Sequence, residues 1–225
     1  MNYYIVTEGR SGSTLLGHYL KQVGLGNPSA WLDEEMESLE AYRDCVHAKA
    51  VNGIISSKIS WGTLSRIQKK IAEVDTLSFL TAVIASPAWI YLTRRNQVKQ
   101  AVSRIKHDRL GAWHVYNDAE LACYHKEDFG LLSESVPTPE IRQRMYQHAL
   151  GNRAWELFFQ SHGIHPLHID FEDFLADKAG TLVEISAHLG KPVSGGDLHD
   201  SVRSTSTYIN EKWYKTVLKG YSDLY

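Results

Sequence analysis

Residues 3–23 read YYIVTEGRSGSTLLGHYLKQV, and this stretch decides the fold. Its first five residues are all β-formers, and such a continuous run is typical of a short strand buried on both faces. Apolar residues then recur at helical spacing from Leu15 to Val23, and Gly24 supplies a stop signal. The stretch therefore predicts a strand over residues 3–7, a tight turn, and a helix that ends near Gly24.

The turn between this strand and this helix contains two glycines, three hydroxyl side chains and one arginine. Backbone N–H groups at a helix N-terminus point into such a turn, and the helix dipole favours a negative charge there. A site for a phosphate or sulfate ester is one interpretation, and an ordinary strand-to-helix turn is the other. A Walker A loop is not matched, because Thr7 stands in place of its first glycine and Ser13 in place of its lysine.

The composition is that of a globular protein in which any anion site is local. The 225 residues, 43% apolar and 22% charged, fit a single domain over residues 1–225. A formal charge of -2 argues against nucleic acid as a partner. The two cysteines and the histidines show no metal-ligand spacing, so we expect reduced thiols and no metal.

The sequence also predicts a cytoplasmic protein. The chain begins directly with its first predicted strand, which argues against a signal peptide. Its most apolar window, residues 77–92, is interrupted by Pro87 and is shorter than the roughly 20 apolar residues that a membrane span needs. The oligomeric state stays open, a homodimer included.

Strands alternate with helices along the whole chain. Further β-rich runs predict strands over residues 53–59, 89–93 and 165–171. Helical patterns cover residues 33–49, 64–74, 98–105, 138–163, 172–176 and 182–189. Residues 108–137 are polar and weakly patterned, which indicates an insertion that covers a substrate site. The alternation predicts an α/β fold of three layers with a central parallel sheet, opened by a P-loop-like strand, loop and helix.

A second cationic turn follows the predicted strand at residues 89–93. Arg95 closes this strand and Ser103 lies two turns into the next helix, so a guanidinium and a hydroxyl can bind one phosphate. Ligands of open parallel sheets collect at the carboxyl ends of strands, so we expect both turns to face one pocket. A nucleotide with phosphates at both ends fits this arrangement, as in 3′-phosphoadenosine 5′-phosphosulfate (PAPS).

RSGST at residues 10–14 and RNQVKQAVS at residues 95–103 resemble the two phosphate-binding elements of PAPS-dependent sulfotransferases. Scattered stretches are similar to the bacterial carbohydrate branch typified by trehalose 2-sulfotransferase: KISW at 58–61, GAWH at 111–114, WELFF at 155–159 and EKW at 211–213. The resemblance implies PAPS as co-substrate, adenosine 3′,5′-bisphosphate as product, a carbohydrate or small-molecule hydroxyl as acceptor, and no obligatory Mg²⁺. The donor-binding residues that it implies are Arg10, Ser11, Gly12, Ser13, Thr14, Arg95 and Ser103.

The residues that would act on the acceptor are marked less clearly. Lys58, at a predicted strand end, is a candidate for assisting the bridging oxygen of the donor, and an exposed strand-end lysine is the alternative. In the trehalose branch, the loop after the first helix has a proline, and a glutamate two residues later is proposed as the base. In this chain the proline is Pro28, and Ala30 stands in place of the glutamate. Candidates to replace that base are Asp33, Glu34, Glu35 and His114, and a reaction that needs no such base is the alternative.

Three functions remain compatible with the sequence. The paired motifs favour sulfuryl transfer from PAPS by in-line displacement. Ala30 motivates a non-catalytic relative that binds the nucleotide, and a degenerate P-loop would permit a nucleotide kinase. Trp31, Trp61 and Trp113 are candidates for stacking on the acceptor, with packing in the core as the alternative.

Overall fold

The computed structural model describes residues 1–71, 74–111, 119–122, 130, 135–193, 198–199 and 205–222. The chain divides into two compact units, residues 1–95 with 151–199 and residues 96–150 with 200–225. The single domain over residues 1–225 stays a prediction. Much of the predicted insertion at 108–137 lies outside the described residues.

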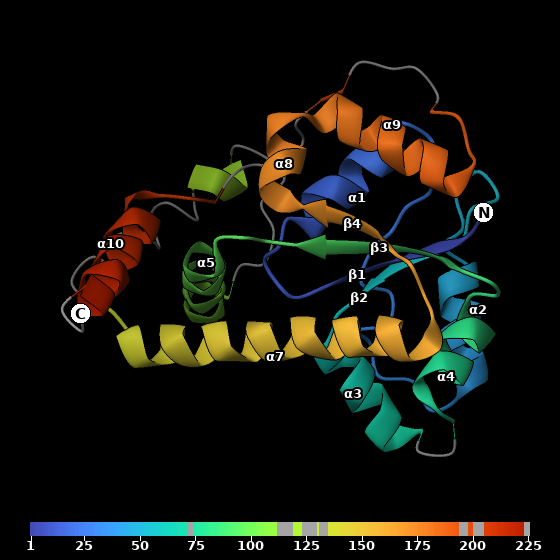
Figure 1. Ribbon diagram of the computed structural model, residues 1–225, viewed down its shortest axis with the longest axis horizontal. Coiled ribbons are helices and arrows are strands. Elements are labelled where there is room, and N and C mark those ends of the chain that lie inside the picture. The colour runs from blue at the N-terminus through green and yellow to red at the C-terminus, as the bar shows by residue number, and fades with distance from the viewer. Residues whose placement is uncertain are drawn as a thin grey trace. The chain divides into compact units, whose positions relative to one another are not determined.

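A four-stranded parallel sheet forms the centre of the first unit (Figure 1). Its order is β2-β1-β3-β4, and Ile5 of β1 pairs with both Lys58 of β2 and Ile90 of β3. The strands are β1 (Tyr3–Thr7), β2 (Ser56–Ile59), β3 (Ala88–Thr93) and β4 (Leu167–Asp170). The predicted parallel sheet is confirmed, and the turns that follow the four strands meet at one edge.

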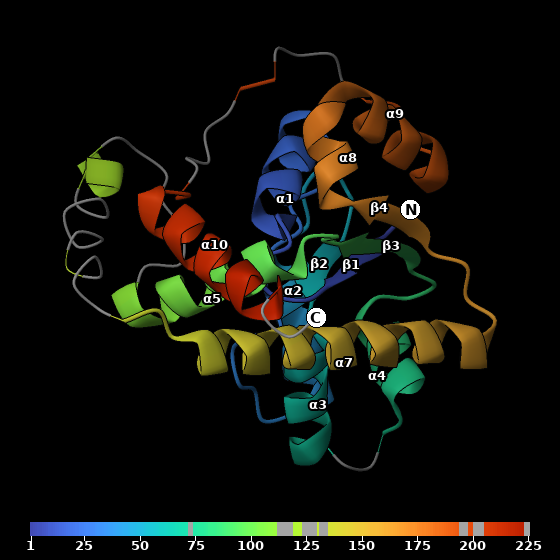
Figure 2. The same cartoon turned by 60° about the vertical axis from the view of Figure 1, so that its left-hand side comes forward.

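Helices cover both faces of this sheet and give the predicted three layers (Figure 2). Tyr3 and Ile5 face the cluster that includes α1, α8 and α9, while Tyr4 and Val6 face the cluster of α2, α3, α4 and α7. The helices of this unit are α1 (Ser13–Gln22), α2 (Leu39–His47), α3 (Trp61–Lys70), α4 (Thr76–Val83), α8 (Phe171–Ala176), α9 (Lys178–Leu189) and, from residue 151, α7 (Thr138–His162).

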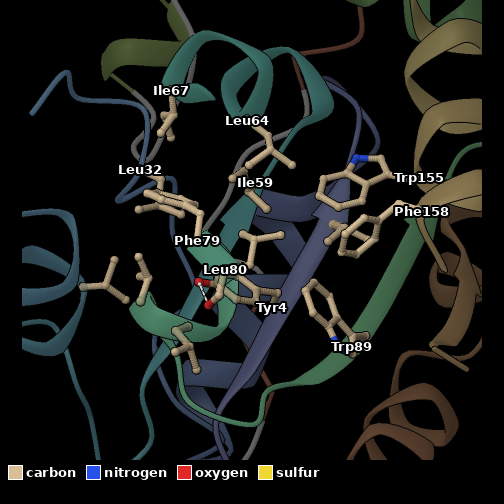
Figure 3. Packing of buried hydrophobic residues seen from close by; sticks show 14 of the residues in the cluster. Tyr4, Leu32, Ile59, Leu64, Ile67, Phe79, Leu80, Trp89, Trp155 and Phe158 are labelled. Atoms are coloured by element: carbon tan, nitrogen blue, oxygen red, sulfur yellow. Dashed lines mark hydrogen bonds between the residues drawn. The ribbon is translucent and has the colours of Figure 1, made fainter. Parts of the chain in front are cut away.

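Aromatic side chains fill the layer between the sheet and this part of α7 (Figure 3). Trp155 is fully buried, and its ring meets Trp61 edge-on at a centroid distance of 5.1 Å. Trp89 meets Phe158 in the same manner at 5.8 Å. Trp61 is therefore partly buried and packs against the core, in line with the alternative interpretation of that tryptophan.

The second unit contains α5 (Gln97–Leu110), α10 (Tyr208–Ser222) and α7 up to residue 150. Ala101, Ile105 and Trp213 belong to its own buried apolar cluster. The buried ammonium of Lys106 donates to the carbonyl of Thr205 at 3.1 Å and to other oxygens of the segment that leads into α10. Within the described ranges, no helix combines the length and apolar composition required to cross a membrane.

Candidate active site

The turn between β1 and α1 is held by its own hydroxyls and by β3. Thr7 Oγ1 donates to the carbonyl of Leu92 at 2.8 Å, and the hydroxyls of Thr7 and Ser11 are hydrogen bonded to each other. Arg10 and Gly12 both have left-handed backbones, with φ of 65° and 88°. A non-glycine residue is strained in that conformation and keeps it only where surrounding contacts hold the backbone.

Gly12 opens the N-terminus of α1 to a ligand. As the N-cap it has no side chain that could bind the first N–H groups, and the first turn of α1 has no acidic residue. By contrast, Ser38 caps α2 and Ser60 caps α3 through their hydroxyls. A Cβ at position 12 would lie 2.2 Å from ring atoms of Phe171, so glycine alone fits. The geometry suits a bound anion.

β2 brings Lys58 to this helix end. Its Nζ donates to Thr14 Oγ1 at 2.8 Å. Burial lowers the pKa of the Lys58 ammonium to about 8, while the Asp33 carboxylate raises this pKa and the Arg10 guanidinium lowers it further. Two cations therefore lie within electrostatic range of each other at the positive end of α1, and both would gain energy from an anion bound there.

Among the acids predicted as the base, Asp33 is the one whose carboxylate acts electrostatically on Lys58. Its N–H donates to the carbonyl of Ala30 at 3.0 Å, so Asp33 lies one turn after the position where the trehalose branch has its glutamate. Thr63, in the first turn of α3, donates its hydroxyl to Asp33 Oδ1 at 2.7 Å and orients the carboxylate. Asp33 and the neighbouring Glu34 are both exposed.

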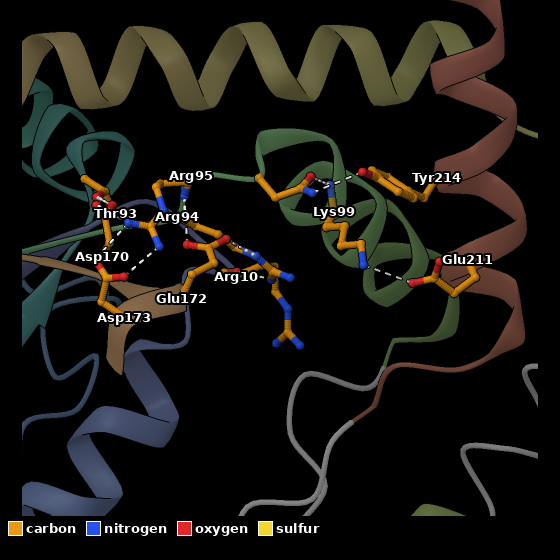
Figure 4. A network of polar contacts seen from close by, with 11 residues as sticks. Arg10, Thr93, Arg94, Arg95, Lys99, Asp170, Glu172, Asp173, Glu211 and Tyr214 are labelled. Atoms are coloured by element: carbon orange, nitrogen blue, oxygen red, sulfur yellow. Dashed lines mark hydrogen bonds and ion pairs between the residues drawn. The ribbon is translucent and has the colours of Figure 1, made fainter. Parts of the chain in front are cut away.

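Arg94, which follows β3, supports the β1–α1 turn from the side of β3 (Figure 4). Its Nη1 donates to the carbonyl of Arg10 at 3.0 Å, and its guanidinium stacks on the Phe171 ring at 4.9 Å. Since Phe171 also contacts Gly12, one arginine and one aromatic ring fix both left-handed residues of the turn.

Arg95 points to α8 instead of to the turn (Figure 4). Its guanidinium binds the carboxylate of Asp173 through two hydrogen bonds of 2.8 and 2.7 Å and pairs with Asp170 at 3.4 Å. Both members of the Arg95–Asp173 pair are more than half exposed. Ser103, the predicted partner of Arg95, lies on α5 in the second unit.

The first unit thus gathers most of the predicted donor site at one edge of the sheet. Residues of the β1–α1 turn and Lys58 are in contact there, whereas Arg95 is occupied by carboxylates. Trp113 and His114 lie outside the described residues. In the part of the chain that the structure describes, no group of three or more His, Cys, Asp or Glu side chains could hold a metal ion.

A family comparison decides what kind of protein has this site. The model of the Stf0 sulphotransferase family matches residues 23–217. The chain belongs to this family. The predicted resemblance to sulfotransferases is confirmed, and sulfuryl transfer is the activity that membership supports. A comparison with proteins of curated function gives no match.

The Stf0 match covers only part of the candidate site. Lys58, Arg95 and Ser103 fall inside residues 23–217, and the β1–α1 turn precedes them. The turn is nevertheless joined to the matched region by the Lys58–Thr14 hydrogen bond and by the Arg94–Arg10 hydrogen bond. Its assignment to the site of this Stf0 protein therefore rests on geometry.

Sequence reasoning missed three residues at this edge: Glu8, Arg94 and Phe171. Arg94 and Arg95 together at the end of a predicted strand were a signal for Arg94. Arg95 was chosen instead, because of its spacing to Ser103. Glu8 had a weaker signal, an acid directly after a buried strand. Phe171 had none, since its role comes from a contact with Gly12, which is distant in sequence.

Proposed function

We propose that this Stf0 sulfotransferase uses PAPS as its donor and transfers the sulfuryl group to a hydroxyl of a carbohydrate or another small molecule. The observation that carries the proposal is the contact of Lys58 with Thr14 at the N-terminus of α1, with the Arg10 guanidinium within electrostatic range of Lys58. Two cations and a helix dipole favour a ligand of concentrated negative charge, such as a phosphosulfate. The backbone at Gly12 and the hydroxyls of Ser13 and Thr14 are of the kind that such a ligand needs.

In the proposed reaction the acceptor oxygen attacks sulfur in line with the leaving 5′-phosphate. The new S–O bond forms as the S–O bond to the bridging oxygen breaks, and that electron pair stays on adenosine 3′,5′-bisphosphate. Such a loose transition state mainly requires positioning and charge stabilisation. Lys58, Arg10 and the N–H groups of α1 would stabilise the charge that develops on the leaving phosphate.

We propose that Asp33 is the base that accepts the proton of the acceptor hydroxyl. Position 30 has no carboxylate, and Asp33 one turn later has one beside Lys58. The Thr63 hydroxyl orients one of its oxygens and leaves the other for the acceptor. Glu34 is the second candidate, and among the described residues the orienting hydrogen bond from Thr63 goes to Asp33.

The test combines donor binding with turnover. Adenosine 3′,5′-bisphosphate should raise the melting temperature of the protein more than Mg-ATP does, and sulfate-labelled PAPS should yield a labelled ester with at least one member of a sugar and small-alcohol panel. Tighter binding of Mg-ATP would refute the donor assignment. Donor binding without transfer to any acceptor would favour the non-catalytic relative that Ala30 suggests.

Arg95 and Ser103 are proposed, from their sequence spacing, to bind the 3′-phosphate of the donor. Arg95 would first have to leave Asp173, and an exposed ion pair of this kind contributes little to stability. Asp173→Asn should therefore tighten the binding of adenosine 3′,5′-bisphosphate about 2- to 5-fold, measured by calorimetry. Adenosine 5′-phosphate, which lacks the 3′-phosphate, is the control and should bind unchanged. Equal changes for both ligands would contradict the assignment.

Donor binding should weaken in alkali because Lys58 loses its proton near pH 8. Both phosphates of adenosine 3′,5′-bisphosphate have second pKa values of about 6, so the ligand itself does not titrate in this range. The dissociation constant should be constant between about pH 7 and pH 8 and rise by up to about tenfold per pH unit above pH 8. Calorimetry across this range measures the profile. Lys58→Arg, which stays charged, should give a flat profile, and a flat wild-type profile would contradict the role of Lys58.

A further inference from the structure

A buried carboxylate beside the β1–α1 turn has no part in the reaction described above. Glu8 is the first residue after β1, and only 8% of its surface is exposed. Glutamate is seldom buried to this extent unless specific partners compensate for the lost hydration. A backbone N–H of α3 is one such partner, and α7 packs against the carboxylate.

One hydrogen-bonding partner lies at the N-terminus of α3. The N–H of Trp61 donates to Glu8 Oε1 at 3.0 Å. Trp61 is the first residue of α3, so this N–H has no acceptor within its own helix. The dipole of α3 also favours a negative charge at this end. Glu8 therefore ties the end of β1 to the start of α3.

The Glu8 carboxylate also packs closely against the backbone of α7 at Gly151. A Cβ at this position would lie 2.4 Å from the carboxyl carbon of Glu8 and 2.6 and 2.7 Å from its two oxygens. Gly151 is inside a helix of 25 residues, where glycine is less favourable than alanine. The Glu8 carboxylate explains this glycine, because any larger residue would displace it.

We propose that Glu8 is a positioning residue for the donor-binding turn, an inference that rests on the proposed function. Besides its hydroxyl contacts and the Phe171 ring, the turn has two anchors: the Glu8 carboxylate holds its start against α3, and Arg94 holds the carbonyl of Arg10. Arg10 lies between them in a left-handed backbone that it does not favour on its own. Without the first anchor the turn relaxes, and the Arg10 guanidinium and the N–H groups of α1 no longer converge on the donor.

The experiment measures the affinity for adenosine 3′,5′-bisphosphate by calorimetry and kcat and KM with PAPS. Glu8→Ala should weaken binding and raise the KM for PAPS at least about tenfold. Glu8→Gln should stay within about threefold of wild type, because its amide oxygen can still accept the Trp61 N–H. Glu184→Ala, which removes an exposed carboxylate of the same unit, is the matched control and should change neither value.

Gly151→Ala provides an independent route to the same result, since its methyl group displaces the Glu8 carboxylate. It should weaken donor binding as Glu8→Ala does, and it should raise the melting temperature only in the Glu8→Ala background. If Glu8→Ala does not fold, Glu8→Asp, which has a shorter reach to Trp61, should show the same weakening.

The outcomes separate this inference from the proposed function. A wild-type protein that does not bind adenosine 3′,5′-bisphosphate would refute the donor assignment and, with it, this role for Glu8. Wild-type binding that Glu8→Ala leaves unchanged would refute the positioning role alone. A Glu8→Gln variant that binds normally but has lost about 100-fold in kcat would make Glu8 a base instead, and would also overturn the proposal.

Discussion

Replacing Lys58 with methionine is expected to remove most of the sulfotransferase activity and, at the same time, to stabilise the fold. Loss of one preorganised donor to a developing oxyanion typically lowers kcat about 100- to 1,000-fold. Lys58 is the buried cation that reaches the N-terminus of α1. We therefore expect a decrease in this range with PAPS and any accepted alcohol, measured as the rate of ester formation.

The gain in stability follows from the direction of the pKa shift. Burial lowers the pKa of Lys58 from 10.5 to about 8, so at pH 7 the folded protein holds an unfavourable charge. The shift corresponds to about 3 kcal/mol, and loss of the bond to Thr14 offsets part of it, which leaves a gain of about 2 kcal/mol for Lys58→Met.

Denaturant unfolding at two pH values checks this expectation. Below pH 8 the destabilising charge is fully present in the wild type, and between about pH 8 and 10.5 its effect disappears, because the folded protein has already lost the proton that the unfolded chain keeps. The advantage of Lys58→Met should therefore shrink to below about 1 kcal/mol at pH 10. If Lys58→Met were less stable than wild type at pH 7, the buried charge of Lys58 would not destabilise the folded protein.

Replacing Gly12 with alanine should disrupt both the fold of the turn and donor binding. The added Cβ would lie 2.2 Å from the Phe171 ring, and position 12 has a φ of 88°. Left-handed backbone costs a non-glycine residue about 1 kcal/mol, and overpacking adds about 1–3 kcal/mol, so a loss of about 3 kcal/mol is expected. Binding of adenosine 3′,5′-bisphosphate should become undetectable, because relief of the clash moves the N-terminus of α1.

Gly53→Ala is the matched control for this variant. Gly53 is also left-handed, with φ of 69°, but a Cβ there would have nothing within 4 Å. It should lose only about 1 kcal/mol in denaturant unfolding and keep its affinity for the bisphosphate. Equal losses in the two variants would show that the contact with Phe171 does not constrain the turn.

Local patterns were sufficient to predict the frame of the first unit. The continuous β-rich run of residues 3–7 became β1 with the predicted bounds, since both faces of that strand are buried. Three further strands were predicted from β-rich runs, and the helices between them predicted that the strands run parallel. The strand predicted at residues 53–59 begins only at Ser56, because Val51 and Ile54 form an antiparallel bridge around a tight turn.

Elements whose boundaries depend on tertiary contacts were not predicted. The apolar window at residues 77–92 contains most of α4, which was missed because the continuous apolar character hides the helix, and most of β3, which was predicted over residues 89–93. The helix predicted over 33–49 begins at Leu39, where Ser38 accepts the N–H of Ala41. In the tail, α10 was missed although Trp213 and Val217 stand four residues apart on its buried side.

In the candidate site, too, the features with a local sequence signal were predicted and the features that depend on tertiary contacts were not. The β1–α1 turn was recognised from neighbouring residues, since glycines, hydroxyls and a cation at a helix start are a local signal. The roles of Asp33 and Arg94 depend on partners from other strands and helices, which spacing along the chain does not reveal. Sequence likewise gave no indication that carboxylates of α8 occupy Arg95.

The left-handed backbone of Arg10 limits how this chain can be improved by laboratory selection. Glycine or asparagine at position 10 would relieve the backbone, but either would remove the guanidinium. At position 58, the buried charge lowers the stability of the fold, but the proposed donor site needs that charge. A library of variants screened for heat resistance alone would therefore be enriched in stable but inactive variants. A screen that also measures turnover would be needed to retain Arg10 and Lys58.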